Sequence, residues 1–401
     1  MKYIKEVVKQ KASSLKDEVI RIRRHLHRFP ELSFKETDTA LFIEKYLDEH
    51  GIHARKRIAG NGIIARIDGR SENGMVIAVR AEMDALPITE SHSTDYCSNN
   101  PGVMHACGHD AHMSMLLGCA RIISELSHCF DGTLLAIFQP GEEKSPGGAK
   151  LIINSGELSN PKPDIFLAQH VLPELETGKV GYIPGKYMAS CDEIYIRIHG
   201  QGGHAALPAT TTDQIYIASK LVVKLREGMA ARIAENNIPT VLGIGKISGR
   251  GATNIVPDTV GIEGTLRTFD ENWRQNALEH IRFLTESTAA EFGVKSEINI
   301  VRGYPVLCND TVLTENAVKL SRELLGDENV EVFEDVRMSS DDFSFYSGLA
   351  PSLYYRIGLR KKNAQVKKLH TPEFDIDENG LETGVANLSW LILNLLSKSS
   401  N

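Results

Sequence analysis

The sequence predicts an α/β protein, with a central, mostly parallel sheet flanked by helices and a smaller α+β sandwich inserted into it. Continuous apolar runs such as Met75–Val79 and Thr133–Phe138 are typical of strands buried on both faces. Segments with helical periodicity separate these runs, as the crossover connections of a parallel sheet require. From about Pro184 the pattern changes to polar–apolar alternation, as in Asp192–Ile198, which indicates a sheet with one exposed face.

The main part begins with two amphipathic helices. The first covers about Tyr3–Arg28, before Phe29-Pro30, and the second covers about Lys35–His50, where Gly51 ends it. We expect a third helix from Asp110, a plausible N-cap. The remaining elements follow in order: strands at 62–67, 75–79, 133–138, 164–168 and 352–357, and helices starting at 147–153 and covering 378–396.

The inserted part covers residues 187–303, which leaves 1–186 and 304–401 as the main domain. Its one-sided strands and two helices predict a compact sandwich with the helices on one face. The expected strands are 192–198, 240–247, 259–266 and 295–301, and the expected helices are 212–227 and 271–292.

Composition excludes several classes of protein. The 401 residues carry 45 Lys+Arg against 52 Asp+Glu, a net charge of −7, which is not the footprint of a nucleic-acid binder. No apolar run approaches the roughly 20 residues needed to span a bilayer. The first residues lack the continuous apolar stretch of a secretory signal, so we expect a cytoplasmic protein with neither nucleic-acid nor membrane partners. Six cysteines without paired spacing are expected to be buried, reduced thiols, Cys107 excepted.

Reactive side chains follow the buried strands. In open α/β sheets, ligands bind beyond the carboxyl ends of the strands. Groups able to bind a metal or move a proton stand at four such ends: Arg80-Ala-Glu-Met-Asp84, Gln139-Pro-Gly-Glu-Glu143, Gln169-His170, and, past a basic loop, Leu369-His370.

The segment His105-Ala-Cys-Gly-His-Asp-Ala-His112 is the densest group of candidate ligands. Cys107 and His109 are two residues apart and cannot share a helix face, but a turn at Gly108 lets both point at one centre. Thiolate with imidazole suits zinc or another first-row transition metal. The alternative is three surface histidines and a core cysteine.

Glu142-Glu143 and His170 are ambiguous when taken alone, as a solvated acidic pair and a structural histidine. In context, one glutamate can hold a metal while its neighbour holds a water. The full set supplies five ligands, enough for two metals if the thiolate bridges them, and a two-metal site activates water and polarises a carbonyl. The ligands are Cys107, His109, Glu143, His170 and His370.

Several motifs resemble those of the M20 metallopeptidase family, and more narrowly its amidohydrolase branch of hippurate hydrolases, N-acyl-amino-acid deacylases and auxin-conjugate hydrolases. The match runs in order along nearly the whole chain. The motifs that carry it are Arg24–Leu32, Arg80–Pro87, Met104–Asp110, Phe138–Glu143, Gly200–Ala206, Ala252–Pro257 and His370–Phe374.

The resemblance implies a role for each position. The five ligands would hold two divalent ions, manganese, zinc, nickel or cobalt, with Cys107 bridging. Glu142 would be the general base, taking a proton from water and returning it to the leaving nitrogen of an N-acyl amino acid. Residues 187–303 would form a lid and dimerisation domain, giving a homodimer or larger assembly. From this lid His204 would stabilise the oxyanion, reaching into the partner's site. Asn254 and Arg267 would contact the substrate.

Asp84 is a candidate for orienting a ligand imidazole, with a turn-capping aspartate as the alternative. Other functions stay open. A dipeptidase or aminopeptidase of the same fold would use the same metals and base. A cysteine hydrolase would use Cys107 as nucleophile with His109 or His112 as base. A binding protein would have kept the fold and lost catalysis, although it would not need Glu142.

Overall fold

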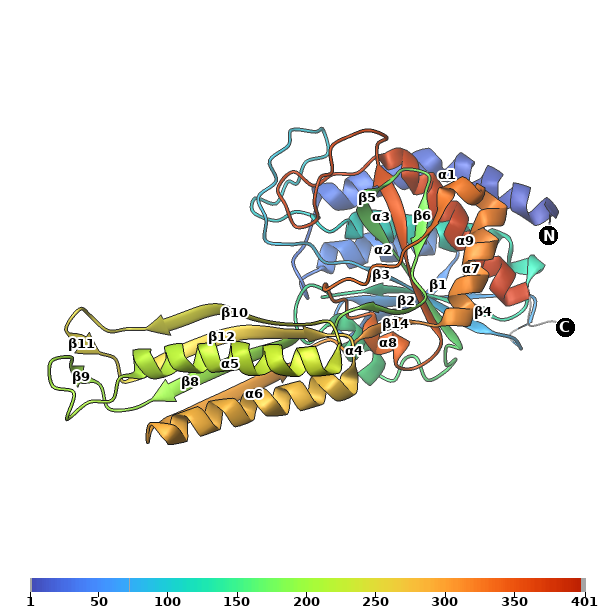
Figure 1. Ribbon diagram of the computed structural model, residues 1–401. Coiled ribbons are helices and arrows are strands. Elements are labelled where there is room, and N and C mark those ends of the chain that lie inside the picture. The colour runs from blue at the N-terminus through green and yellow to red at the C-terminus, as the bar shows by residue number, and fades with distance from the viewer. Residues whose placement is uncertain (1, 72, 398–401) are drawn as a thin grey trace. The chain divides into compact units, whose positions relative to one another are not determined.

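The computed structural model describes residues 2–71 and 73–397, which divide into two compact units (Figure 1). Unit 1 comprises the described residues of 1–185, 308–335 and 342–401. Unit 2 comprises 186–307 together with 336–341, so it takes in a second short segment that a single insertion at 187–303 does not include. Among the described residues, no helix is both long and apolar enough to cross a membrane.

Unit 1 is built on an eight-stranded sheet in the order β1-β2-β4-β3-β5-β16-β6-β15. The four central strands, β4, β3, β5 and β16, are parallel to one another, which confirms the predicted sheet. Every residue of β3 and β4 is buried, as their continuous apolar sequences require. The strands are β1 His53–Ile58, β2 Gly62–Asp68, β3 Val76–Glu82, β4 Thr133–Gln139, β5 Ile165–Glu176, β6 Val180–Tyr182, β15 Val330–Val332 and β16 Ser352–Arg360.

Helices α1 (Lys2–Arg28), α3 (His109–Glu125) and α9 (Leu381–Ser397) pack against one another, and α3 and α9 also contact β3. Several elements of unit 1 were not expected from the sequence, among them the strands β1, β6 and β15 and helix α7 (Thr311–Leu325), which packs on α9. The remaining helices of unit 1 are α2 Thr37–Glu49, α4 Gly148–Asn154 and α8 Ser344–Ser347.

Unit 2 has a four-stranded antiparallel sheet in the order β10-β12-β8-β13, covered by two helices. Alternate residues of β8, including Ile194, Ile196 and Ile198, enter the core beneath the helices, as the alternating pattern predicts. The elements are β8 Asp192–His199, α5 Gln214–Asn236, β10 Thr240–Gly249, β12 Thr259–Thr268, α6 Glu271–Glu291 and β13 Lys295–Arg302. A small separate sheet pairs β9 (Gly203–His204) with β11 (Ile255–Val256).

None of the six cysteines forms a disulfide. Cys107 and Cys119 are buried, Cys97, Cys129 and Cys191 are half-buried, and Cys308 is exposed. Of the five thiols expected to be buried, only that of Cys119 is, so the expectation was wrong for the other four.

Candidate metal centre

The loop before α3 places two of the predicted ligands. Gly108 has φ +81°, a left-handed conformation, and a Cβ atom there would lie 2.7 Å from a methyl group of Val171. Only glycine fits this position, and the turn lets Cys107 and His109 point at one centre, as predicted. Gly108 also caps α3, so the prediction of Asp110 as N-cap was wrong. Asp110 instead lies in the first turn of the helix, where its fully buried carboxylate binds a distant arginine.

The five predicted ligands come together in unit 1. Two groups of possible ligand atoms each lie within 4.8 Å of one another. The first comes from Cys107, Glu143 and His370, and the second from His109, Glu142 and Glu143. The Cys107 sulfur is 3.5 Å from His170 Nε2 and 3.3 Å from His370 Nε2. The thiol therefore lies within reach of both imidazoles, as a bridging ligand must.

Two histidines are held so that Nε2 is free to bind a metal. His109 donates from Nδ1 to the Asp84 carbonyl oxygen at 2.8 Å, and His170 donates from Nδ1 to the Val171 carbonyl oxygen at 2.8 Å. In the neutral imidazole, donation from Nδ1 fixes the tautomer and leaves the lone pair on Nε2. Within the described part of the chain, buried His109 Nε2 has no hydrogen-bond partner. Orphaned acceptors of this kind are costly unless a ligand satisfies them, so the cluster fits a cation.

His370 reaches the cluster from a strained backbone. Its φ is +59°, which is unfavourable for a residue with a Cβ atom, and its N–H donates to the Ala106 carbonyl oxygen at 2.8 Å. Nε2 lies 3.1 Å from Glu143 Oε1, and half of the His370 side chain is exposed. Strain of this kind persists only where surrounding contacts hold it, and it is common at functional sites.

Asp84 supports both glutamates as well as an imidazole. Its carboxylate accepts the Glu142 N–H at 3.1 Å, the Glu143 N–H at 2.9 Å and the Ser33 hydroxyl at 2.7 Å. Oδ1 also lies 3.5 Å from His109 Nδ1. Burial alone would raise the pKa of Asp84, but the hydrogen bond and charge of His109, with those N–H and O–H donors, hold it below the usual value. The carboxylate therefore stays ionised.

Glu82 and His112 belong to the same region, although the sequence argument did not include them in the metal site. His112 Nδ1 lies 2.9 Å from Glu82 Oε2, and His112 Nε2 accepts the Val171 N–H at 2.9 Å. Because both ring nitrogens are engaged, His112 is not available as a base. The signal was present, since the i, i+3 spacing of His109 and His112 puts them on one face of a helix.

Cys107 is poorly suited to act as a nucleophile. Burial, and then the negative charges of Glu143, Glu142 and Glu82, raise the pKa of its thiol well above the usual value. A nucleophilic cysteine needs the opposite environment, one that lowers the pKa. These surroundings disfavour the cysteine-hydrolase alternative.

The predicted residues of unit 2 lie at two separate places in that unit. His204 pairs with Ile255 across β9 and β11, and the Ala205 N–H donates to the Asn254 carbonyl oxygen at 3.0 Å, so His204 and Asn254 are neighbours. Arg267 lies near the far end of β12, eight residues beyond Thr259, or about 26 Å along an extended strand. It donates to the Met338 carbonyl oxygen at 3.1 Å and the Ser340 hydroxyl at 3.2 Å.

Comparison with known proteins agrees with this geometry. The peptidase family M20/M25/M40 matches residues 78–394. An N-acetyl-L-cysteine deacetylase of Bacillus subtilis is 37% identical over 92% of this chain and 86% of its own length. An N-acyl-L-amino acid amidohydrolase of Geobacillus stearothermophilus is 38% identical over 76% of this chain and 81% of its own. A solved Bacillus subtilis structure, described as a dinuclear metal-binding peptidase of family M20, superimposes with a TM-score of 0.83 at 30% identity, covering 96% of this chain and 99% of that one. The chain belongs to the peptidase family M20/M25/M40.

Proposed function

We propose that the protein is a metal-dependent amidohydrolase that cleaves the amide bond of N-acyl amino acids. The observation that carries the proposal is the convergence of one thiol, three imidazoles and one carboxylate beside a second carboxylate, Glu142, with His109 Nε2 left without a hydrogen-bond partner among the described residues. The deacetylase and amidohydrolase relatives support an N-acyl amino acid as substrate.

The donor set suits two divalent ions. Glu143 and His370 would hold one and His109 and His170 the other, with the Cys107 sulfur between His170 and His370 as a shared ligand. Softness favours zinc, nickel or cobalt at the thiolate, and manganese is the fourth candidate. When bound, the ions supply Lewis acidity that activates water and polarises the substrate carbonyl.

Glu142 is the proton carrier in this proposal. Its N–H is held by Asp84, and its carboxylate lies in the group with His109 and Glu143. It takes a proton from the attacking water and returns it to the leaving nitrogen. Glu143 differs from Glu142 because it lies in two groups of candidate ligand atoms. One is the group with Cys107 and His370, and the other is the group with His109 and Glu142.

A paired substitution tests this division of labour. Glu142→Gln should keep its metals and lose about 10²–10⁴-fold in kcat, the usual effect of removing a general base. Glu143→Gln, the matched control one residue away, should lose metal. Elemental analysis measures the metal content, and turnover is measured on N-acetyl, N-benzoyl and indole-acetyl amino acids. Near-normal kcat in Glu142→Gln, or loss of its metal, contradicts the assignment.

Chelation separates the hydrolase classes. Dialysis against a chelator should abolish activity, and adding back Mn²⁺, Zn²⁺, Co²⁺ or Ni²⁺ should restore it. Activity that survives confirmed metal removal would rule out the proposal in favour of the Cys107 nucleophile. Dipeptides and tripeptides belong in the same assay, because faster turnover of free peptides than of N-acyl amino acids would favour the peptidase alternative.

We also propose that the protein is a homodimer whose sites are completed by unit 2. His204 would stabilise the oxyanion, and Asn254 and Arg267 would contact the substrate. The separation of about 26 Å along β12 supports contributions from two copies, because one small substrate cannot contact both ends of a single unit 2. The cytoplasmic location stays a prediction.

Complementation tests the shared site. His204→Ala should lower kcat by about 10²–10³-fold without releasing metal, as loss of one oxyanion donor does. Mixing it with Glu142→Gln subunits should restore activity, since a mixed dimer has one site with both residues intact. Proven subunit exchange without recovered activity would exclude the arrangement in trans.

A further inference from the structure

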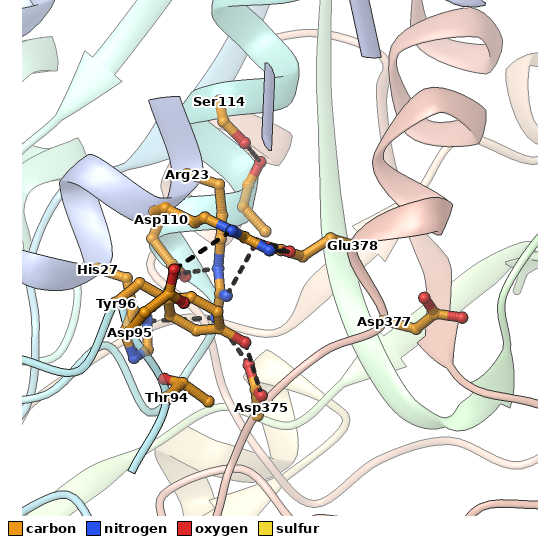
Figure 2. Close-up of polar contacts among 12 residues, drawn as sticks. Arg23, His27, Thr94, Asp95, Tyr96, Asp110, Ser114, Asp375, Asp377 and Glu378 are labelled. Carbon is orange, nitrogen blue, oxygen red and sulfur yellow. Dashed lines mark hydrogen bonds and ion pairs between the residues drawn. The ribbon is translucent and has the colours of Figure 1, made fainter. Parts of the chain in front are cut away.

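A fully buried arginine in α1 binds three carboxylates, which come from two other segments of unit 1. Arg23 donates from Nε to Asp110 at 2.7 Å, from Nη2 to Asp375 at 3.0 Å and from Nη1 to Glu378 at 3.3 Å. Figure 2 shows the guanidinium among these three groups, with Tyr96 beside it. A fork of fixed N–H donors matches three partners in a way that a lysine ammonium cannot.

The buried charges at this point depend on Arg23. Asp110 and Arg23 have no exposed side-chain surface, and Asp375 and Glu378 are mostly covered. Carboxylates buried this close together stay ionised only while a cation is between them.

Two of these carboxylates adjoin the predicted ligands. Asp110 directly follows His109, and Asp375 lies five residues after His370. Residues 361–368, which precede His370, are all exposed, so little packing fixes that side of the loop. On the other side the Tyr96 hydroxyl donates to Asp375 at 3.0 Å, on the oxygen that Arg23 does not use.

We propose that Arg23 is a positioning residue for the metal centre, which ties the loop of His370 to the loop of Cys107 and His109 through Asp375 and Asp110. The inference rests on the metal centre of the proposed function. The strained backbone of His370, at φ +59°, is the feature that such a tie has to hold in place. Asp375→Asn should therefore weaken the ion that uses His370 and leave the other ion nearly unchanged.

The neighbouring arginine offers a matched control. Arg24 also binds Glu378, through Nε at 3.0 Å and Nη2 at 2.7 Å, but its side chain is 40% exposed and no hydrogen bond to Asp110 or Asp375 is found for it among the described residues. Arg24→Met thus removes a bond to the same cluster without cutting the tie between the two loops.

The test is titration of the metal-free protein with Co²⁺. Binding is monitored by calorimetry and by the visible absorption of the bound ion. Asp375→Asn should lose about 10–100-fold in affinity for one of two ions, the usual effect of removing a group that orients a ligand. Arg23→Met should lose at least as much. If Arg23→Met does not fold, Asp375→Asn alone carries the test, because it leaves the arginine paired with Asp110 and Glu378.

A double-mutant cycle with His370→Ala, measured by Co²⁺ affinity, separates a positioning role of Asp375 from a merely structural one. If Asp375 acts through His370, Asp375→Asn should have no further effect on Co²⁺ affinity in the His370→Ala protein. Wild-type Co²⁺ binding by folded Asp375→Asn, an equal loss in Arg24→Met, or an undiminished loss in the His370→Ala background would each overturn the proposal. A wild-type protein that binds no Co²⁺ would instead overturn the proposed metal centre.

Discussion

Replacing Asp84 with asparagine tests whether a residue that is not itself a predicted ligand holds the proposed metal centre in place. The carboxylate is completely buried and accepts hydrogen bonds from the N–H groups of Glu142 and Glu143 and from the Ser33 hydroxyl. An asparagine side chain has one oxygen and one NH₂ group, and the NH₂ group cannot accept. Whichever way it is turned, at least one backbone N–H of the glutamate pair faces a donor.

The contacts set the size of the effect. A hydrogen bond to a charged group contributes about 1.5–3 kcal/mol, so the free energy of unfolding should fall by about that amount. Loss of an outer-shell partner typically costs about 10–100-fold in metal affinity, which corresponds to about 1.4–2.7 kcal/mol. Activity should fall as well, because the backbone that carries Glu142 loses a fixed acceptor.

The pH dependence gives an independent check on the metal-free protein. Because the pKa of Asp84 is lower in the folded state than its ordinary value of 3.8, its ionised form contributes stability above that value. This contribution is lost as the pH falls through the folded-state pKa. Asp84→Asn lacks the titrating group, so its stability should fall less steeply on acidification below about pH 4.

Ser33→Ala is the matched control. It removes one donor from the same carboxylate but keeps the charge and both backbone N–H bonds, so it should cost about 1.5–3 kcal/mol of stability, as one hydrogen bond to a charged group does, and leave metal affinity unchanged. Urea unfolding at several pH values and calorimetric titration with Zn²⁺ measure both quantities. If Asp84→Asn bound Zn²⁺ as tightly as wild type and kept its kcat, Asp84 would not support the centre.

Two further substitutions test the environment of the site. Burial raises the pKa of Glu36 from 4.5 to about 7. Backbone hydrogen bonds oppose this shift in part, and the charge of Asp84 adds to it. Stability is therefore lost as the pH rises from about 4.5 to about 7, and Glu36→Gln should gain on wild type by about 2–3 kcal/mol between pH 5 and pH 8. An equal stability difference at both pH values in urea unfolding would contradict this. Gly108→Ala should cost at least about 2 kcal/mol and weaken metal binding, because φ is +81° and the new methyl group would lie 2.7 Å from Val171; thermal unfolding with and without metal measures both effects.

The convergence of the predicted ligands could be foreseen because it follows from strand order. β4, β3, β5 and β16 are parallel neighbours, so the residues after their apolar runs meet at one edge of the sheet. The turn at Gly108 could be predicted for a similar reason, since two ligands separated by one residue need a glycine between them to point the same way. In both cases the information is local in the sequence.

The missed elements had weaker or unused signals. Strand β1 reads His-Ala-Arg-Lys-Arg-Ile, and half of its residues are exposed, so it has no apolar pattern to detect. Helix α7 did have a signal, because Asp310 caps it and Leu313, Ala317 and Leu324 are buried at helical spacing. The first was hidden by its position at the sheet edge, and the second could have been found from the sequence.

The N-cap prediction at Asp110 shows where local reasoning stops. An aspartate at the start of an apolar helix is a good cap by itself, but here its carboxylate binds Arg23, 87 residues earlier in the chain. The same arginine reaches Asp375 across 352 residues. No spacing rule joins such positions, because their contact depends on α1 packing against α3. A charged residue with a plausible local role can therefore serve a distant one, and the residues that hold a metal centre in shape are the ones that motifs are least able to reveal.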